Sequence, residues 1–175
     1  TKGAANIRRE MDFEANTLIG SHGYCTQDLV NLLLTGDAYS NVFNGVNRLD
    51  KDMILKGVEI QSDIGFLTLF ERYGHCNVGT FYKCPKYPVW VICSESHYSV
   101  IFSENSDIIL GGDGKFDLNY YDELARQDEE IHLTVEPGSY VPPGDDDLVP
   151  PIDDVIRTKW ARSQVDWNGR EPFLQ

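Results

Sequence analysis

The sequence predicts an α+β domain, in which helices pack against an antiparallel sheet. In the first half of the chain, apolar residues recur at helical spacing in two stretches, residues 26–36 and 64–74. In the second half, several short runs are rich in Val, Ile, Tyr and Phe, which is typical of strands. The stretch 85–103 joins two such runs through a short polar segment, which predicts a hairpin at the centre of the fold.

Length, composition and charge restrict the class of protein. The 175 residues are enough for one domain, 1–175, and the apolar, aromatic and charged fractions are ordinary for a globular protein. The formal net charge of −13 argues against a nucleic-acid partner, because such a surface repels the phosphate backbone, and it suits a partner with a basic face. No run approaches the roughly 18 apolar residues of a membrane helix, and no leader opens the chain. We therefore expect no membrane partner and a cytoplasmic or nuclear setting.

The four cysteines could form two disulfides, but we expect free thiols, because intracellular chains usually keep cysteine reduced. No C-x-x-C pair exists, and the group His75, Cys76 and Cys84 fits zinc-ligand spacing poorly. The acidic run 145–147 lacks the ligand spacing and the closing Glu of a calcium loop. The sequence therefore predicts no metal site.

The first helix is expected at residues 27–35. Thr26 can cap its start and Gly36 can end it, whereas residues 1–14 show no start signal. Three leucines recur at helical spacing and predict the face that packs on the core: Leu29, Leu32 and Leu33.

The next elements are less regular. The polar residues 47–52 indicate a loop, and residues 55–60 indicate a short strand. Residues 64–71 predict a second helix that Gly74 can end, and residues 76–81 indicate an extended segment.

The central hairpin is expected to pair the apolar runs 89–93 and 98–102, with His97 at the start of the second strand. Two more strands are predicted at 116–122 and 131–135.

The end of the chain is expected to pack against this sheet. The Pro-rich, acidic stretch 137–151 indicates a connector without secondary structure, and residues 152–160 predict a helix. Trp167 would then pin the tail to the domain.

His97 is the first candidate for chemistry, because a histidine on a rigid strand beside a loop can act as a general base. Asp122 is the candidate that would orient it: if its strand pairs with the strand of His97, the carboxylate approaches the far ring nitrogen and fixes the tautomer. The alternatives are an ordinary surface histidine and an ordinary carboxylate at a strand end.

Cys25 is a candidate nucleophile, because it lies directly before a capped helix, where the dipole lowers the pKa of a thiol. The alternative is a small buried residue, since free cysteine is often buried.

The chain resembles the MINDY family of deubiquitinases, and the resemblance covers nearly the whole sequence. The strongest match is residues 88–100, PVWVICSESHYSV. The other matching motifs are residues 25–36 (CTQDLVNLLLTG), 40–43 (SNVF), 64–71, 73–79 (YGHCNVG), 116–118, 120–122, 156–160 (IRTKW) and 165–169 (VDWNG).

The resemblance implies a thiol-dependent hydrolase of papain-like type that cleaves isopeptide bonds in polyubiquitin without a cofactor. His97 matches the catalytic histidine of the family, whereas Asp122 as its orienter rests on strand placement alone. The family nucleophile lies upstream in a glycine-rich motif that this sequence lacks, and Cys25 matches a cysteine outside the catalytic set. We therefore expect the C-terminal, histidine-bearing portion of a catalytic domain, with the nucleophile on a missing upstream segment of the same protein.

Two other functions remain open. One is a non-catalytic ubiquitin-binding or scaffolding module, and the other is a thiol enzyme that uses Cys25.

Overall fold

The computed structural model describes residues 2–51, 53–112, 114–125, 127–144 and 148–173. Within these ranges, a six-stranded sheet in the order β3-β4-β5-β6-β7-β8 lies beside a two-stranded sheet, β1-β2. The strands are β1 Val46–Arg48, β2 Ile54–Lys56, β3 Gly65–Thr68, β4 Val89–Ser94, β5 His97–Phe102, β6 Phe116–Tyr121, β7 Ile131–Glu136 and β8 Gln164–Asp166. The helices are α1 Ala4–Glu10, α2 Gln27–Thr35, α3 Leu69–Arg72, α4 Thr80–Lys83 and α5 Pro151–Lys159, with 3-10 turns η1 Ser106–Leu110 and η2 Glu123–Ala125. The predicted α+β class is confirmed.

The central hairpin forms as the sequence predicts. Strands β4 and β5 are antiparallel, and Ser94 pairs with His97 across a two-residue turn. Glu95 has a φ of 57° in that turn, a left-handed conformation that a tight hairpin requires. His97 therefore stands at the start of β5, beside the turn.

The second half of the chain also agrees with its pattern. Strands β6, β7 and β8 continue the sheet in antiparallel order, and α5 occupies nearly the whole predicted helix. Trp167 is buried, and its indole N–H donates to Asp153 Oδ1 at 3.0 Å, which ties the tail to α5. The acidic run 145–147 lies outside the described residues.

The helix predicted at 64–71 is wrong in its first half. Residues 65–68 form the fully buried strand β3, which pairs in parallel with β4, so the sheet is mixed rather than wholly antiparallel. A strand buried on both faces has a continuous apolar run that cannot be told from a helix by period alone. Gly65 is required here, because a Cβ would lie 2.1 Å from Cδ1 of Trp90.

The caps of α2 are confirmed, but its predicted buried face is wrong. Thr26 accepts a hydrogen bond from the Leu29 N–H, and Gly36 ends the helix at a φ of 82°. Leu33 is nevertheless 75% exposed, while Asn31 is fully buried. The buried face is therefore partly polar, which an apolar-spacing argument cannot find.

Three shorter elements also depart from the sequence pattern. The loop predicted at 47–52 is partly strand, because β1 pairs with β2. The extended segment predicted at 76–81 turns helical at α4, and α1 forms without a start signal in the sequence.

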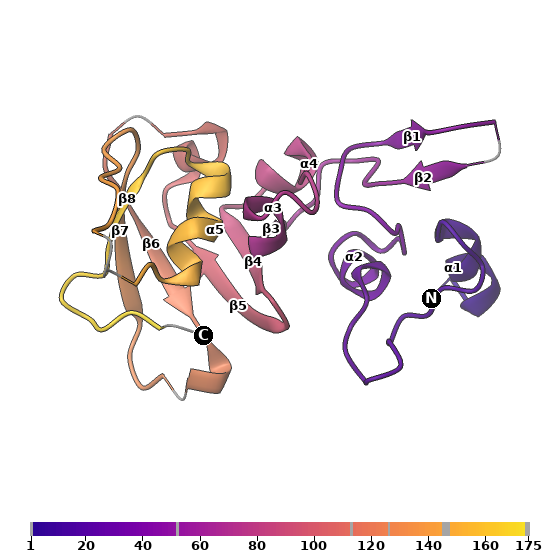
Figure 1. Cartoon of the computed structure of the whole chain (residues 1–175), viewed down its shortest axis with the longest axis horizontal. Helices are drawn as coiled ribbons and strands as arrows, with labels where there is room; N and C mark the ends of the chain where they lie inside the picture. Colours follow the sequence, from indigo (N-terminus) through magenta and orange to yellow (C-terminus); the bar gives the residue numbers. More distant parts are fainter. Residues whose placement is uncertain (1, 52, 113, 126, 145–147, 174–175) are drawn as a thin grey trace.

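Two apolar cores lie on opposite faces of β3 and β4. Leu67, Trp90 and Ile92 pack with α5 on one face. Phe66 and Cys93 pack on the other face with residues of α2 and α4. In Figure 1, α5 covers the sheet, whereas α1, α2 and the small sheet lie beyond the β4–β5 hairpin. We call these sides the α5 face and the α2 face.

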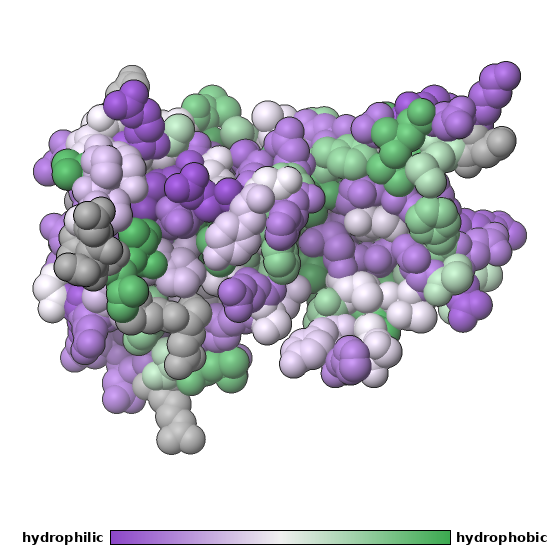
Figure 2. Space-filling view, in the orientation of Figure 1, coloured by the Kyte–Doolittle hydropathy of each residue, from purple (hydrophilic) through white to green (hydrophobic). Residues whose placement is uncertain are grey.

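The outer surface is mostly hydrophilic on the side shown in Figure 2, with separate apolar patches that include one over β1 and β2. None of the helices in the described residues has the length and apolar content needed to cross a bilayer.

Candidate active site

His97 and Asp122 meet on the α5 face. Successive side chains of a strand point to opposite faces, so His97 shares its face with Ile101, a member of the α5-face core. Asp122 directly follows β6, which pairs with β5. Its Oδ2 lies 2.7 Å from His97 Nε2. The Asp122 side chain is 7% exposed and the His97 side chain is 18% exposed, so the carboxylate is buried while the ring reaches the surface.

The Asp122 carboxylate is fixed by its own turn. Oδ1 accepts the Leu124 N–H at 3.0 Å, and Oδ2 also accepts the Tyr120 hydroxyl at 3.3 Å. The side chain of Gln127 clamps the backbone, since its Oε1 accepts the Asp122 N–H and its Nε2 donates to the Tyr120 carbonyl. These bonds fix the position of the acid before any substrate arrives.

This arrangement sets the tautomer of His97. A carboxylate only accepts hydrogen bonds, so the ring nitrogen that faces it, Nε2, must carry the proton. The lone pair of the neutral ring is then on Nδ1. An imidazole held in this way can take a proton at Nδ1, while Asp122 stabilises the imidazolium that results.

In the described residues, no hydrogen bond joins Cys25 to His97. Cys25 is exposed, and its backbone forms a bridge with Ile19 just before α2. Burial raises the pKa of Tyr98, and the charges of the Cys93 and Cys25 thiolates add to that shift. Tyr98 is one residue from His97 on β5 and points to the α2 face.

The remaining cysteines offer no better partner. Burial raises the pKa of the Cys93 and Cys76 thiols, which disfavours the reactive thiolate. Within the described part of the chain, none of the four cysteines has a hydrogen bond to His97. The described residues also contain no cluster of side chains suited to a metal ion.

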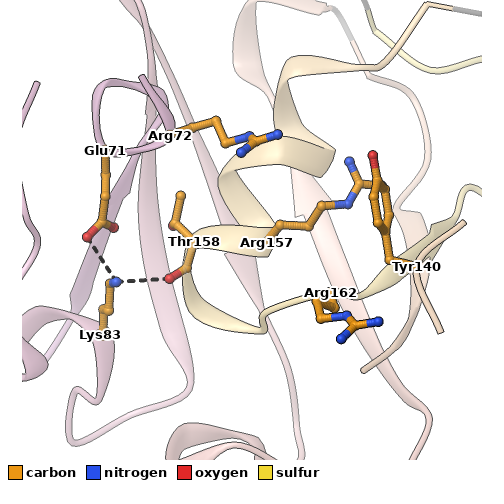
Figure 3. Close-up of a pocket in the computed structure, with 7 residues that line it drawn as sticks. All are labelled: Glu71, Arg72, Lys83, Tyr140, Arg157, Thr158 and Arg162. Carbon is orange, nitrogen blue, oxygen red and sulfur yellow. Dashed lines mark hydrogen bonds and ion pairs between the residues drawn. The ribbon is translucent and has the colours of Figure 1, made fainter. Parts of the chain in front are cut away.

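A separate cavity of about 390 Å³ lies between α3 and α5, away from this pair (Figure 3). Lys83 bonds to Glu71 and to the Thr158 carbonyl, and Arg157 stacks over the Tyr140 ring at 4.5 Å. Most of its cations already have acidic partners, so these side chains mainly hold the helices together.

Sequence reasoning predicted that Asp122 approaches His97, which the contact agrees with, but it missed the groups that hold the acid. The alternation of β6 places Tyr120 and Asp122 on one face, and this signal was available in the sequence. Gln127 lies in a loop, where no period reveals it.

A histidine held by a buried acid at a strand start, with one ring nitrogen available, has the geometry that a general base needs. Residues 1–169 match the family model described as deubiquitinating enzyme MINDY-3/4, conserved domain. The chain therefore belongs to the MINDY-3/4 family.

Named relatives agree with this assignment. The chain is 51% identical over 175 residues to the probable ubiquitin carboxyl-terminal hydrolase MINDY-4 of Mus musculus, which covers 96% of the chain and 24% of the relative. The Homo sapiens MINDY-4 is 50% identical, with 96% and 23% covered. The ubiquitin carboxyl-terminal hydrolase MINDY-3 of Xenopus tropicalis is 43% identical over 110 residues, with 62% and 25% covered.

The chain spans about a quarter of the length of the curated relatives it matches. No solved structure matches it.

Proposed function

We propose that this chain is the histidine-bearing portion of a cysteine-type deubiquitinase that hydrolyses isopeptide bonds in polyubiquitin. His97 is its general base and Asp122 orients His97. The proposal is carried by the 2.7 Å contact between His97 Nε2 and Asp122 Oδ2, in a chain that belongs to the MINDY-3/4 family. The nucleophilic thiol comes from a segment upstream of this chain, in a papain-like arrangement with His97.

In this mechanism His97 moves one proton in each half-reaction. Nδ1 takes the proton of the thiol, and the thiolate attacks the isopeptide carbonyl. The imidazolium gives that proton to the leaving lysine amine as the C–N bond breaks, which leaves a thioester on the cysteine. His97 then deprotonates a water that attacks the thioester, and the proton returns to the thiol.

A second candidate function is a ubiquitin-binding module without hydrolase activity. It is supported by the lack of a hydrogen bond between His97 and any of the four cysteines in the described residues. The charge of −13 suits a partner with a basic face under either function.

The test compares variants of the chain joined to its native upstream sequence, with isopeptide-linked diubiquitin as the substrate. We expect His97→Ala to lower kcat/KM by at least about 100-fold, the usual contribution of a positioned acid–base group. The matched control is His132→Ala, which removes an exposed histidine from β7 and should leave the rate unchanged.

The outcome decides between the two candidates. Ubiquitin binding without cleavage by the wild-type protein would favour the binding module. Cleavage that survives His97→Ala would remove His97 from the mechanism.

A further inference from the structure

We propose that Tyr120 is a positioning residue, whose hydroxyl holds the Asp122 carboxylate so that His97 keeps its proton on Nε2. This inference rests on the proposed function for its role in catalysis. The contacts that carry it stand without that function.

The geometry makes Tyr120 the second donor to one oxygen. Asp122 Oδ2 receives both His97 Nε2–H at 2.7 Å and the Tyr120 hydroxyl at 3.3 Å. With Leu124 N–H on Oδ1, the carboxylate has a donor on each oxygen and a single orientation. Removal of the tyrosine hydroxyl leaves His97 as the single donor to Oδ2, which weakens the hold on the oxygen that faces the ring.

The phenol remains a donor over the working pH range. Burial, opposed by the Ser99 hydroxyl and aided by the Asp122 carboxylate, raises the pKa of Tyr120 to about 12. A neutral phenol near a buried carboxylate donates a hydrogen bond to it, and such charge-assisted bonds are stronger than neutral ones.

The ring of Tyr120 has a separate, structural task. It is 2% exposed and contacts the rings of Trp167 and Phe173, each at a centroid distance of 5.9 Å. Tyr120→Phe preserves these contacts and removes only the hydroxyl. The variant therefore separates positioning from packing.

The chain also offers a matched control. Tyr82 is fully buried, and its hydroxyl donates to Asn31 Oδ1 at 2.7 Å in the α2-face core. Tyr82→Phe removes an equally buried hydroxyl that has no contact with Asp122. If the effect comes only from lost stability, both variants should show it. If it comes from lost positioning of Asp122, only Tyr120→Phe should show it.

The direct experiment is NMR of this chain labelled with ¹⁵N-histidine, at pH 8, where an ordinary imidazole is mostly neutral. In the wild type, and in Tyr82→Phe, we expect the His97 proton on Nε2. In Tyr120→Phe we expect a mixture of the two tautomers and faster exchange of the Nε2 proton. A His97 spectrum unchanged by Tyr120→Phe, or altered equally by both variants, would overturn the proposal.

Activity is the second readout, measured with the chain joined to its upstream sequence and with diubiquitin. Tyr120→Phe should lower kcat about tenfold with little change in KM, because loss of a bond to a charged group acts through His97 rather than on substrate binding. A change in KM alone would contradict a positioning role. If the wild type cleaves nothing, the proposed function fails, while the NMR result still decides whether Tyr120 positions Asp122.

Discussion

The α2 face and the α5 face each contain a buried tyrosine hydroxyl that donates a hydrogen bond to a polar side chain, but the two acceptors have different surroundings. On the α2 face, Tyr82 donates to Asn31, whose amide N–H groups bond to the Tyr39 and Asn41 carbonyls and so tie a loop to α2. On the α5 face, Tyr120 donates to Asp122 Oδ2, which also bonds to a histidine that reaches the surface. The first hydrogen bond ends among backbone groups and supports the fold, whereas the second ends on a partly exposed imidazole, where the proposed function needs a positioned base.

The largest expected effect is on the α5 face, in Asp122→Asn. The Leu124 N–H requires an acceptor at the Oδ1 position, so the introduced amide must turn its NH₂ group toward His97. His97 must then accept at Nε2 and carry its proton on Nδ1, which removes the base. For the chain joined to its native upstream sequence, we expect kcat/KM with diubiquitin to fall about 10³- to 10⁴-fold. A fall smaller than tenfold would show that Asp122 does not set the tautomer.

The matching change on the α2 face should affect stability rather than rate. Asn31→Leu leaves the Tyr82 hydroxyl and two carbonyls without their partner in a buried site. We expect a loss of about 3 kcal/mol in the free energy of unfolding, measured with urea, because unpaired buried groups keep their desolvation cost. Leu33→Asn changes an exposed residue of the same helix and should cost less than about 0.5 kcal/mol. Equal losses in the two variants would contradict the polar network.

The packing of β3, which lies between the two faces, can be tested by a substitution at Gly65. A methyl group there would lie 2.1 Å from the Trp90 ring, so Gly65→Ala must displace β3 or the indole. We expect a loss of about 2 kcal/mol in thermal or urea unfolding, typical of overpacking. Gly20→Ala is the control, since its nearest atom would be at 3.6 Å, an ordinary contact. A stable Gly65→Ala protein would argue against the parallel β3–β4 pair.

A further expected effect is a pH dependence of stability at Lys159 on the α5 face. Burial lowers the pKa of Lys159 to about 8, below its ordinary value of 10.5. Between these values the unfolded chain binds the extra proton, so this lysine makes stability rise as pH increases from 8 to 10. Lys159→Met removes that rise, so the stability of the variant relative to the wild type should fall across this window. A difference that stays constant in urea unfolding from pH 7 to 10 would contradict the shift.

Sequence patterns predicted those elements whose local signals agree with their burial. The strands of the hairpin, β6 and β7 are short runs rich in β-branched and aromatic residues, and α2 has both of its caps. The patterns failed where tertiary packing decides. Residues 65–68 are apolar at every position because both sides of β3 are covered, and this removes the period that separates a strand from a helix.

The part of the candidate site that lies on adjacent strands was predictable from the sequence. His97 and Asp122 follow from strand pairing, and their observed contact agrees with that reasoning, whereas their catalytic roles stay predictions. Gln127 lies in a loop, so no sequence pattern indicates that its side chain bonds to the backbone of Asp122.

The most direct test of the roles proposed for His97 and Cys25 is an intact-mass measurement. The chain joined to its native upstream sequence is first reacted with a ubiquitin probe that carries a C-terminal thiol-reactive group. The difference between the two faces predicts that Cys25→Ala forms the adduct as the wild type does, while His97→Ala forms it at least about 100-fold more slowly. An adduct lost in Cys25→Ala and kept in His97→Ala would place the chemistry on the α2 face and contradict the account.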